Sequence, residues 1–136
     1  MEHVAPQLVD LQRAAFRIEA ALIQDDRIPQ LTESVEELTA AGLVWHVVLD
    51  NNRPVAAIAY CWDGEGLDID RLVVHPSRHR QGLARRLLAS LPQGPATVST
   101  GRDNPPARRL YEGLGFRHTG DREVLPGLWL SSYARP

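Results

Sequence analysis

A short polar loop at the start of a predicted helix is the part of the sequence best suited to chemistry. It lies within the segment 70–88, DRLVVHPSRHRQGLARRLL, where Arg78 and Arg80 come just before Gly82. Backbone N–H groups at the start of a helix have no acceptor within the helix, and a glycine lets a ligand approach them closely. With arginine charge beside them, these groups predict an anion-binding loop. The alternative is an ordinary strand–turn–helix connection in which the glycine only eases the turn.

Other kinds of chemistry have less support in the sequence. The loop has neither the Gly-Lys-Ser/Thr ending of a P-loop nor the GxGxxG pattern of a dinucleotide-binding fold. His3, His46 and His118 are scattered and do not form a metal-binding pattern, so no metal is expected. The single cysteine, Cys61, excludes an internal disulfide framework and a cysteine-based zinc site, and we expect it to be a small core residue in a strand.

The elements that position the loop follow from the spacing of apolar residues. From Leu8 to Leu22 they recur at helical spacing, and Ser34 with Glu37 forms a capping-box pattern, so residues 1–40 predict two helices. Three β-rich runs with short connections follow and predict an antiparallel meander. We expect these strands at 43–49, 55–62 and 67–74, then a helix at 81–91, a strand at 96–100, a helix at 104–114 and a hairpin from 116–119 and 128–133. This order predicts an α/β fold, a central mixed sheet flanked by about four helices, with residues 1–136 as one domain.

The charge is divided unevenly along the chain. All 15 basic residues are arginines, and the net charge is −2. Up to Asp70, 4 arginines stand against 13 acids, whereas from Arg71 onward 11 arginines stand against 4 acids. Either the two halves are solvated faces of different charge, or one half receives an anion and the other attracts a cation. No apolar run approaches the ~20 residues of a membrane-spanning helix, and the start does not read as a leader, so we expect a cytoplasmic protein with no membrane partner.

Two stretches of the sequence are similar to the motifs of a known family. VVHPSRHRQGLARRLL, 73–88, resembles a motif with the core Gln/Arg-x-x-Gly-x-Gly/Ala, and NPPARRLYEGLGF, 104–116, resembles the motif that follows it. On these residues the chain resembles the GNAT superfamily of acyl-CoA-dependent N-acyltransferases. There are two departures, His79 at the first core position and the absence of the family's first strand. The sheet is therefore expected to be one strand short, with an edge that is exposed or covered by a partner, which leaves a homodimer open.

The resemblance implies acetyl-CoA as co-substrate. Its pyrophosphate would lie over the backbone N–H groups of 79–84, and its pantetheine arm would pair with the backbone of 72–74 between diverging strands. Asn104 would contact the arm. Tyr111 would touch the cofactor and protonate the departing thiolate, unless it only packs on the cofactor or the core. The cofactor-binding residues implied in this way are Leu72, Val73, Val74, His79, Arg80, Gln81, Gly82, Leu83, Ala84, Asn104 and Tyr111.

The implied reaction also needs a base, because an alkylamine with a pKa near ~10.4 arrives protonated. Asp70 is the first candidate and Asp68 the second. Period-two geometry predicts that residues 68, 70, 72 and 74 share one face of the third strand, so both carboxylates would face the same cleft. The alternative is that one or both are solvated acids or partners of Arg71.

These inferences predict an acetyl-CoA-dependent N-acetyltransferase. It would transfer an acetyl group to a primary amine of a small molecule or peptide, by direct attack in a ternary complex. Acids and tryptophans fall in the expected acceptor region, where the acids favour a cationic amine, although tryptophans in strands are more often core. They are Glu33, Glu36, Glu37, Asp63, Glu65, Trp45, Trp62 and Trp129. The rival is a catalytically inactive acyl-CoA-binding regulatory module, and no nucleic-acid partner is expected, because an RNA-binding motif and interleaved surface aromatics are missing.

Overall fold

The structure is a computed structural model that describes residues 4–136, and its order of helices and strands is the predicted one. The helices are α1 (Ala5–Ile23), α2 (Val35–Ala40), α3 (Leu83–Ala89) and α4 (Pro105–Gly113), with short 3-10 turns η1 (Pro29–Leu31) and η2 (Pro76–Arg78). The strands are β1 (Val44–Asp50), β2 (Arg53–Trp62), β3 (Leu67–Val74), β4 (Ala96–Gly101), β5 (Arg117–Leu125) and β6 (Leu128–Arg135).

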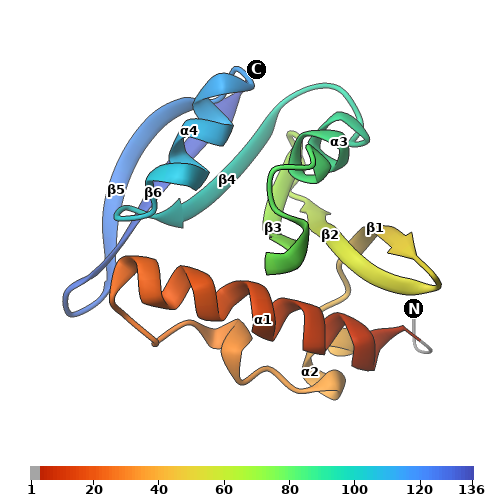
Figure 1. Ribbon diagram of the computed structural model, residues 1–136. Coiled ribbons are helices and arrows are strands. Elements are labelled where there is room, and N and C mark those ends of the chain that lie inside the picture. Colours follow the sequence, from red (N-terminus) through yellow and green to blue (C-terminus); the bar gives the residue numbers. More distant parts are fainter. Residues whose placement is uncertain (1–3) are drawn as a thin grey trace.

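The strands form a mixed sheet in the order β1-β2-β3-β4-β6-β5 (Figure 1). All neighbours are antiparallel except β3 and β4, which are parallel. The β3–β4 ladder is short, since it pairs only residues 67–69 with 96–98. A mixed sheet of this kind follows from the sequence order, because helix α3 separates the parallel pair β3 and β4, whereas tight turns join β1 to β2, β2 to β3 and β5 to β6.

Helices cover both faces of the sheet. On one face, α1 and α2 bury a cluster around Leu8, Leu11 and Leu38, and on the other, α3 and α4 bury a cluster that includes Leu87 and Tyr111. Each buried leucine contributes roughly 2 kcal/mol through the hydrophobic effect. The capping box that starts α2 is present as predicted, with reciprocal hydrogen bonds between Ser34 and Glu37. The two apolar layers hold the sheet between them and fix the strand ends at which the loops lie.

A β-bulge in β3 overturns one prediction about faces. Ile69 pairs with Tyr60 and Arg71 pairs with Ala59, so Asp70 is an extra residue without a partner on β2. An extra residue reverses the alternation of side chains beyond it. Leu67, Ile69, Leu72 and Val74 accordingly pack toward α3 and α4, whereas Val73 packs toward α1 and α2. The expectation that residues 68, 70, 72 and 74 share one face is therefore wrong, and Asp68, which pairs with Cys61, lies on the opposite face from Leu72.

Candidate active site

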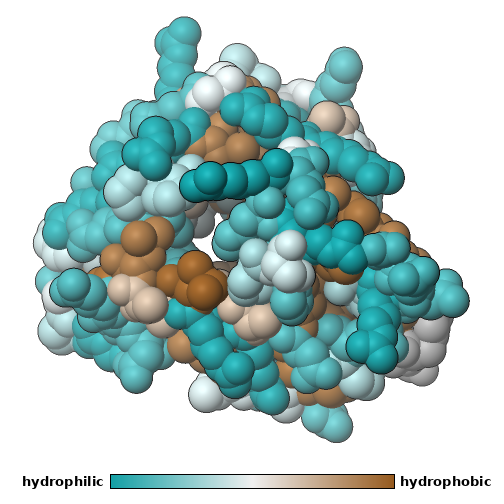
Figure 2. Space-filling view, in the orientation of Figure 1, coloured by the Kyte–Doolittle hydropathy of each residue, from teal (hydrophilic) through white to brown (hydrophobic). Residues whose placement is uncertain are grey.

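The sheet opens between β3 and β4. Beyond Ile69 the two strands no longer pair, and β4 continues instead along β6 as far as Gly101 opposite Leu130. Within the described residues, 71–74 pair with β2 only and Asp70 pairs with neither neighbour, so the other edge of this part of β3 is free. Figure 2 shows a hollow at the corresponding place, between the ends of β3 and β4 and above α1 as drawn in Figure 1. A free strand edge beside a hollow can accept an extended ligand as an additional strand.

The loop between η2 and α3 lies at the end of this free edge. In the part of the chain that the structure describes, the backbone N–H groups of residues 79–85 donate no hydrogen bond to another residue. Arg80 and Gly82 both have left-handed backbones, with φ of 65° and 74°. A side chain added at Gly82 would meet nothing within 4 Å, so the space before the loop is open. Unpaired N–H groups around an open space suit an anion such as a diphosphate.

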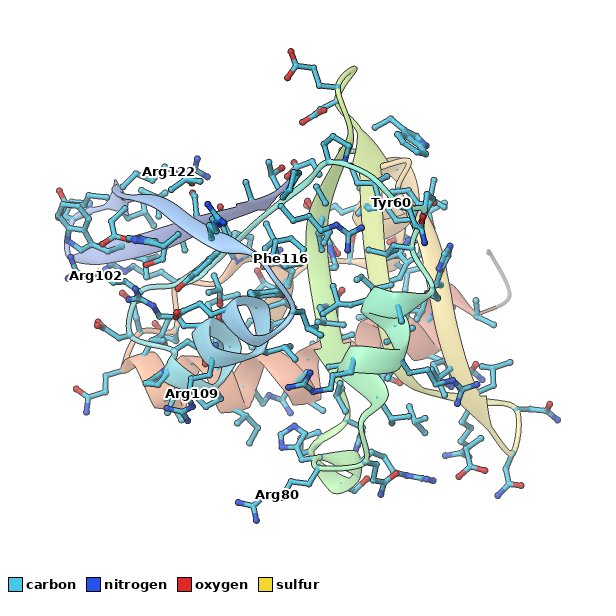
Figure 3. The ribbon with its side chains drawn as sticks, turned by 90° about the horizontal axis from the view of Figure 1, so that it is seen from above. Tyr60, Arg80, Arg102, Arg109, Phe116 and Arg122 are labelled. Carbon is cyan, nitrogen blue, oxygen red and sulfur yellow. The ribbon has the colours of Figure 1, made fainter. Side chains whose placement is uncertain are left out.

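Arginines surround the loop in different roles. Arg78 forms an ion pair with Asp50 in the β1–β2 turn and so anchors the loop to the sheet. Arg80 is exposed, and Figure 3 shows it extending toward the same side of the molecule as Arg109 of α4. His75 accepts a hydrogen bond from the backbone N–H of Ser77 and starts the η2 turn. Arg80 and Arg109 are therefore the exposed arginines on this side of the molecule, whereas Arg78 is paired with Asp50.

The two predicted bases are both held by neighbours. Asp68 is exposed and its Oδ1 accepts a hydrogen bond from Thr97 Oγ1 at 2.9 Å. Asp70 Oδ2 accepts one from Arg71 Nε at 2.6 Å. The alternative reading of Asp70 as a partner of Arg71 thus matches the contacts. The role of either residue as a base stays a prediction.

Arg71 is the centre of a buried polar cluster. Its side chain is 5% exposed and donates from Nη1 to Glu33 Oε1 at 2.6 Å and to Gln12 Oε1 at 3.1 Å, besides its bond to Asp70. Burial raises the pKa of the Glu33 carboxyl, but the hydrogen bonds from Arg71 and Gln12 outweigh it and the pKa is lowered. The cluster connects α1, the segment before α2, and β3. Glu33 therefore stays ionised, with its charge paired to that of Arg71, and it contributes little to an acidic acceptor site.

Tyr111 lies on the inner face of α4, in the apolar cluster that α3 and α4 cover. Its ring centroid is 5.6 Å from that of Phe116 and 6.1 Å from that of Tyr133. Burial, with a smaller contribution from the charge of Glu19, raises the pKa of its hydroxyl far above the ordinary value. The hydroxyl makes no hydrogen bond to a described residue and is still reached by solvent. The hydroxyl is thus a protonated donor without a partner among the described residues, and its catalytic role stays a prediction.

Asn104 is engaged within the protein. Its Oδ1 accepts a hydrogen bond from Ala107 N at 3.3 Å, which caps α4, and its Nδ2 donates to Glu19 Oε1 at 3.3 Å. The side chain is 8% exposed. Its contact with a cofactor arm remains a prediction, and its described contacts are with the helix cap and Glu19.

Glu19 is a residue of this region that the sequence reasoning missed. It lies on the sheet-facing side of α1, about three helical turns after Leu8 and two after Gln12. Because it is partly buried, the pKa of its carboxyl is raised, although hydrogen bonds from Asn104 and from the backbone of Gly101 oppose the shift. A carboxylate in the middle of an apolar helix face is a signal that could have been found from the spacing alone.

The other predicted acceptor residues do not come together. Glu37 belongs to the capping box, and Asp63 accepts the backbone N–H groups of Glu65 and Gly66 in a turn. The tryptophans lie in three places: Trp45 has Arg71 over its ring at 5.8 Å, Trp62 is 62% exposed, and Trp129 has Arg102 over its ring at 4.7 Å. Glu36 and Glu65 are exposed. This set therefore has no common pocket.

The remaining observations concern metals, thiols and membranes. Among residues 4–136 no group of three His, Cys, Asp or Glu side chains is placed to hold a metal, and His3 lies outside the described residues. Burial and nearby aspartates raise the pKa of the Cys61 thiol, which makes it a poor nucleophile. None of the described helices is long and apolar enough to cross a membrane.

Comparison with protein families and curated proteins identifies relatives of the sequence. The sequence matches the family "Acetyltransferase (GNAT) domain" over residues 41–118. It is 30% identical over 135 residues to the UPF0157 protein YqkA of Bacillus subtilis (strain 168), and this match covers 96% of this chain and 39% of that protein. The chain therefore spans well under half the length of this relative.

Solved structures share the fold. The ribosomal-protein-S18-alanine N-acetyltransferase from Escherichia coli superposes with a TM-score of 0.77 at 18% identity, covering 97% of this chain and 86% of that one. PaiA N-acetyltransferase from Thermoplasma acidophilum, solved with coenzyme A, has a TM-score of 0.74 at 13% identity and coverages of 96% and 92%. YncA from Salmonella typhimurium, solved with acetyl-CoA, has 0.73 at 17% identity and coverages of 98% and 88%. At these identities the likeness is one of fold.

Proposed function

Because the chain belongs to the GNAT acetyltransferase family, we propose that it is an acetyl-CoA-dependent N-acetyltransferase that acetylates a primary amine of a small molecule or peptide. The observation that carries this proposal is the opening in the sheet. A free edge of β3 at 70–74 leads directly to a loop whose N–H groups have no acceptor among the described residues. An extended arm that ends in a diphosphate, as in acetyl-CoA, suits these two features.

The residues fit this co-substrate in two places. The N–H groups of 79–84 would hold the pyrophosphate, since the loop is open and carries the exposed Arg80. The backbone of 72–74 would pair with the amide groups of the pantetheine arm, as an added strand does. Backbone recognition also explains why the side chains there are apolar valines and a leucine.

The reaction proposed is direct transfer of the acetyl group from sulfur to nitrogen. The bound amine must first lose a proton, because an ammonium has no lone pair for attack. Tyr111 would donate a proton to the departing thiolate, because its hydroxyl makes no hydrogen bond to a described residue. Asp70 and Asp68 remain candidate bases, each with a hydrogen bond already made.

A second function is favoured by the hydrogen bonds that Asp70 and Asp68 already make. If neither aspartate can take a proton, the domain would bind an acyl-CoA without turning it over and would act as a regulatory module. The two functions differ in consumption of acetyl-CoA, not in its binding. They are thus distinguished by one assay.

The test is release of thiol from acetyl-CoA with a panel of amines, namely polyamines, amino acids, aminoglycosides and N-terminal peptides, alongside calorimetry with coenzyme A. The proposal expects binding of coenzyme A and amine-dependent thiol release. Binding without turnover across the panel would support the regulatory module instead. Absence of any heat with coenzyme A would overturn both.

A further inference from the structure

Glu19 connects the two layers of the fold at the opening in the sheet. It belongs to α1, which packs with the layer on one face, and its carboxylate contacts the residue that caps α4 of the other layer. Its Oε1 accepts a hydrogen bond from Asn104 Nδ2 at 3.3 Å and would lie 3.7 Å from a side chain added at Gly101. The carboxylate therefore lies at the end of β4, where β3 and β4 have separated.

The surroundings of Glu19 contain few charges. From β4 the backbone of Gly101 faces it, from α4 Asn104 and Tyr111, and from α1 itself the neighbouring Ile23. Tyr111 is the titratable group among these. Within residues 4–136 no arginine forms an ion pair with Glu19, in contrast to Asp70 and Glu33, which share Arg71. Among the described residues, Glu19 is therefore the carboxylate of this region that has no cationic partner.

The need for such a group follows from the proposed function, on which this inference rests. Asp68 lies on the opposite face from Leu72 and Val74, because of the bulge at Asp70. Asp70 is held by Arg71. Glu19, in contrast, acts electrostatically on Tyr111, the candidate acid. A base and an acid near one thioester are what acetyl transfer requires.

We propose that Glu19 is the general base of this protein, the group that removes a proton from the acceptor amine at the opening between β3 and β4. The Glu19 carboxylate takes one proton from the ammonium and later releases it to solvent. The nitrogen lone pair forms the C–N bond, the C–S bond breaks, and its electron pair goes to sulfur. The thiolate receives a proton from the Tyr111 hydroxyl, which the second proton of the nitrogen replaces. Acetyl-CoA and an ammonium thus give an amide, coenzyme A and one proton.

Asn104 is the positioning residue in this arrangement. Its amide nitrogen donates to Glu19 while its oxygen caps α4, so the helix cap fixes the direction of the carboxylate. The backbone of Gly101 donates a further hydrogen bond to the same carboxylate. The apolar Ile23 beside Gly101 limits water around the carboxylate, and this burial raises its pKa.

The experiment compares Glu19→Gln and Glu19→Asp with Asp10→Asn, an exposed acid on the same helix as matched control. Glutamine keeps an oxygen for Asn104 and nearly the same shape but cannot take a proton. We expect Glu19→Gln to lower kcat roughly 100-fold or more with unchanged affinity for coenzyme A by calorimetry. Glu19→Asp should keep part of the wild-type activity, and the control Asp10→Asn should keep all of it.

The pH profile distinguishes a base from a structural residue. In the wild type, kcat/KM should rise with pH through the pKa of Glu19, which lies above its ordinary value, and this limb should vanish in Glu19→Gln. A Glu19→Gln enzyme with wild-type turnover, or with reduced turnover but the same limb, would overturn the assignment while leaving the acetyltransferase in place. A wild type that binds coenzyme A but acetylates no amine would instead overturn the proposed function, and this inference with it.

Discussion

The hydroxyl of Tyr111 is a buried donor that no described residue uses. It makes no hydrogen bond to a described residue, whereas the hydroxyl of Tyr133 beside it accepts one from Arg108 Nε at 2.8 Å. Two buried tyrosines that differ in this way are suited to different tasks. A paired hydroxyl holds structure together, and an unpaired one that solvent reaches can serve a substrate.

Tyr111→Phe should separate the acid from the packing. We expect kcat to fall roughly 100-fold with unchanged affinity for coenzyme A and an unchanged melting temperature, because no hydrogen bond is lost. Tyr133→Phe is the matched control and should melt earlier while it keeps turnover, since Arg108 loses its acceptor. Thiol release, calorimetry and thermal melting measure the three quantities. Full activity in Tyr111→Phe would remove Tyr111 as the acid.

The ionised carboxylate of Glu19 should lower the free energy of unfolding at neutral pH. Its pKa is raised in the folded state, so the folded protein holds the proton more tightly than the unfolded chain does. Stability attributable to this group is therefore greatest below its unfolded pKa and declines as pH rises through the raised value. We expect Glu19→Gln to melt at a higher temperature than the wild type near about pH 7 and at the same temperature near about pH 4. A lower melting temperature at neutral pH would show that the charged carboxylate stabilises the fold.

At the level of elements, the polar cluster around Arg71 holds α1 and the segment before α2 against β3. Arg71→Met leaves the carboxylate of Glu33 without its cation, and breaking a buried pair in this way costs roughly 3–5 kcal/mol. Because Arg71 lowers the pKa of Glu33, the wild type should lose this stabilisation as pH falls through that lowered value. Denaturant unfolding of both proteins at neutral and acid pH measures the difference. Equal stability at neutral pH would contradict it.

The loop before α3 should tolerate no negative side chain. Gly82→Asp adds charge and bulk where the N–H groups of 79–84 would meet a diphosphate, and we expect coenzyme A binding to be lost. Gly42→Asp is the matched control, because Gly42 has nearly the same φ, 66°, and also has nothing within 4 Å of an added Cβ. It shares the backbone strain but lies away from the opening, so calorimetry should show normal binding. Binding retained in Gly82→Asp would remove the loop from the site.

The elements were predictable where a local pattern determines them. The spacing of apolar residues and the turn residues placed β3 at 67–74, and the capping box placed α2. The predicted helix at 81–91 is shorter in the structure because Gly82 is left-handed and α3 begins only after it. The last hairpin is longer than predicted, since β5 is a polar edge strand with almost every side chain exposed and has no apolar alternation to mark it.

The candidate site was predictable only in part. The anion loop and Tyr111 follow from motifs, but the bulge at Asp70 depends on pairing with β2 and has no local signal. It reversed the face on which the bases were expected. Glu19 had a signal, its place on the apolar face of α1, and its role becomes visible only when α1 is seen to cross the separated strands (Figure 1).

For the molecule as a whole, the uneven charge predicts how binding depends on salt. The loop that would receive the diphosphate belongs to the part of the chain with 11 arginines against 4 acids. Raising sodium chloride from about 0.05 to about 0.5 M shortens the range of this attraction, and we expect coenzyme A to bind several-fold more weakly. Pantetheine, which lacks the phosphates, is the control and should be unaffected. An equal response of both ligands would show that the arginines do not act on the phosphates.

Only three residue pairs connect β3 to β4, so the two halves of the sheet depend on the apolar layers that cover them and on whatever fills the opening. A bound metabolite that bridges them adds stability in proportion to the logarithm of its concentration. The fraction of chains that are intact, and therefore spared by proteases, would then follow the cell's supply of acetyl groups. In a cell short of acetyl groups, this protein would be lost by unfolding before its activity was limited by lack of substrate.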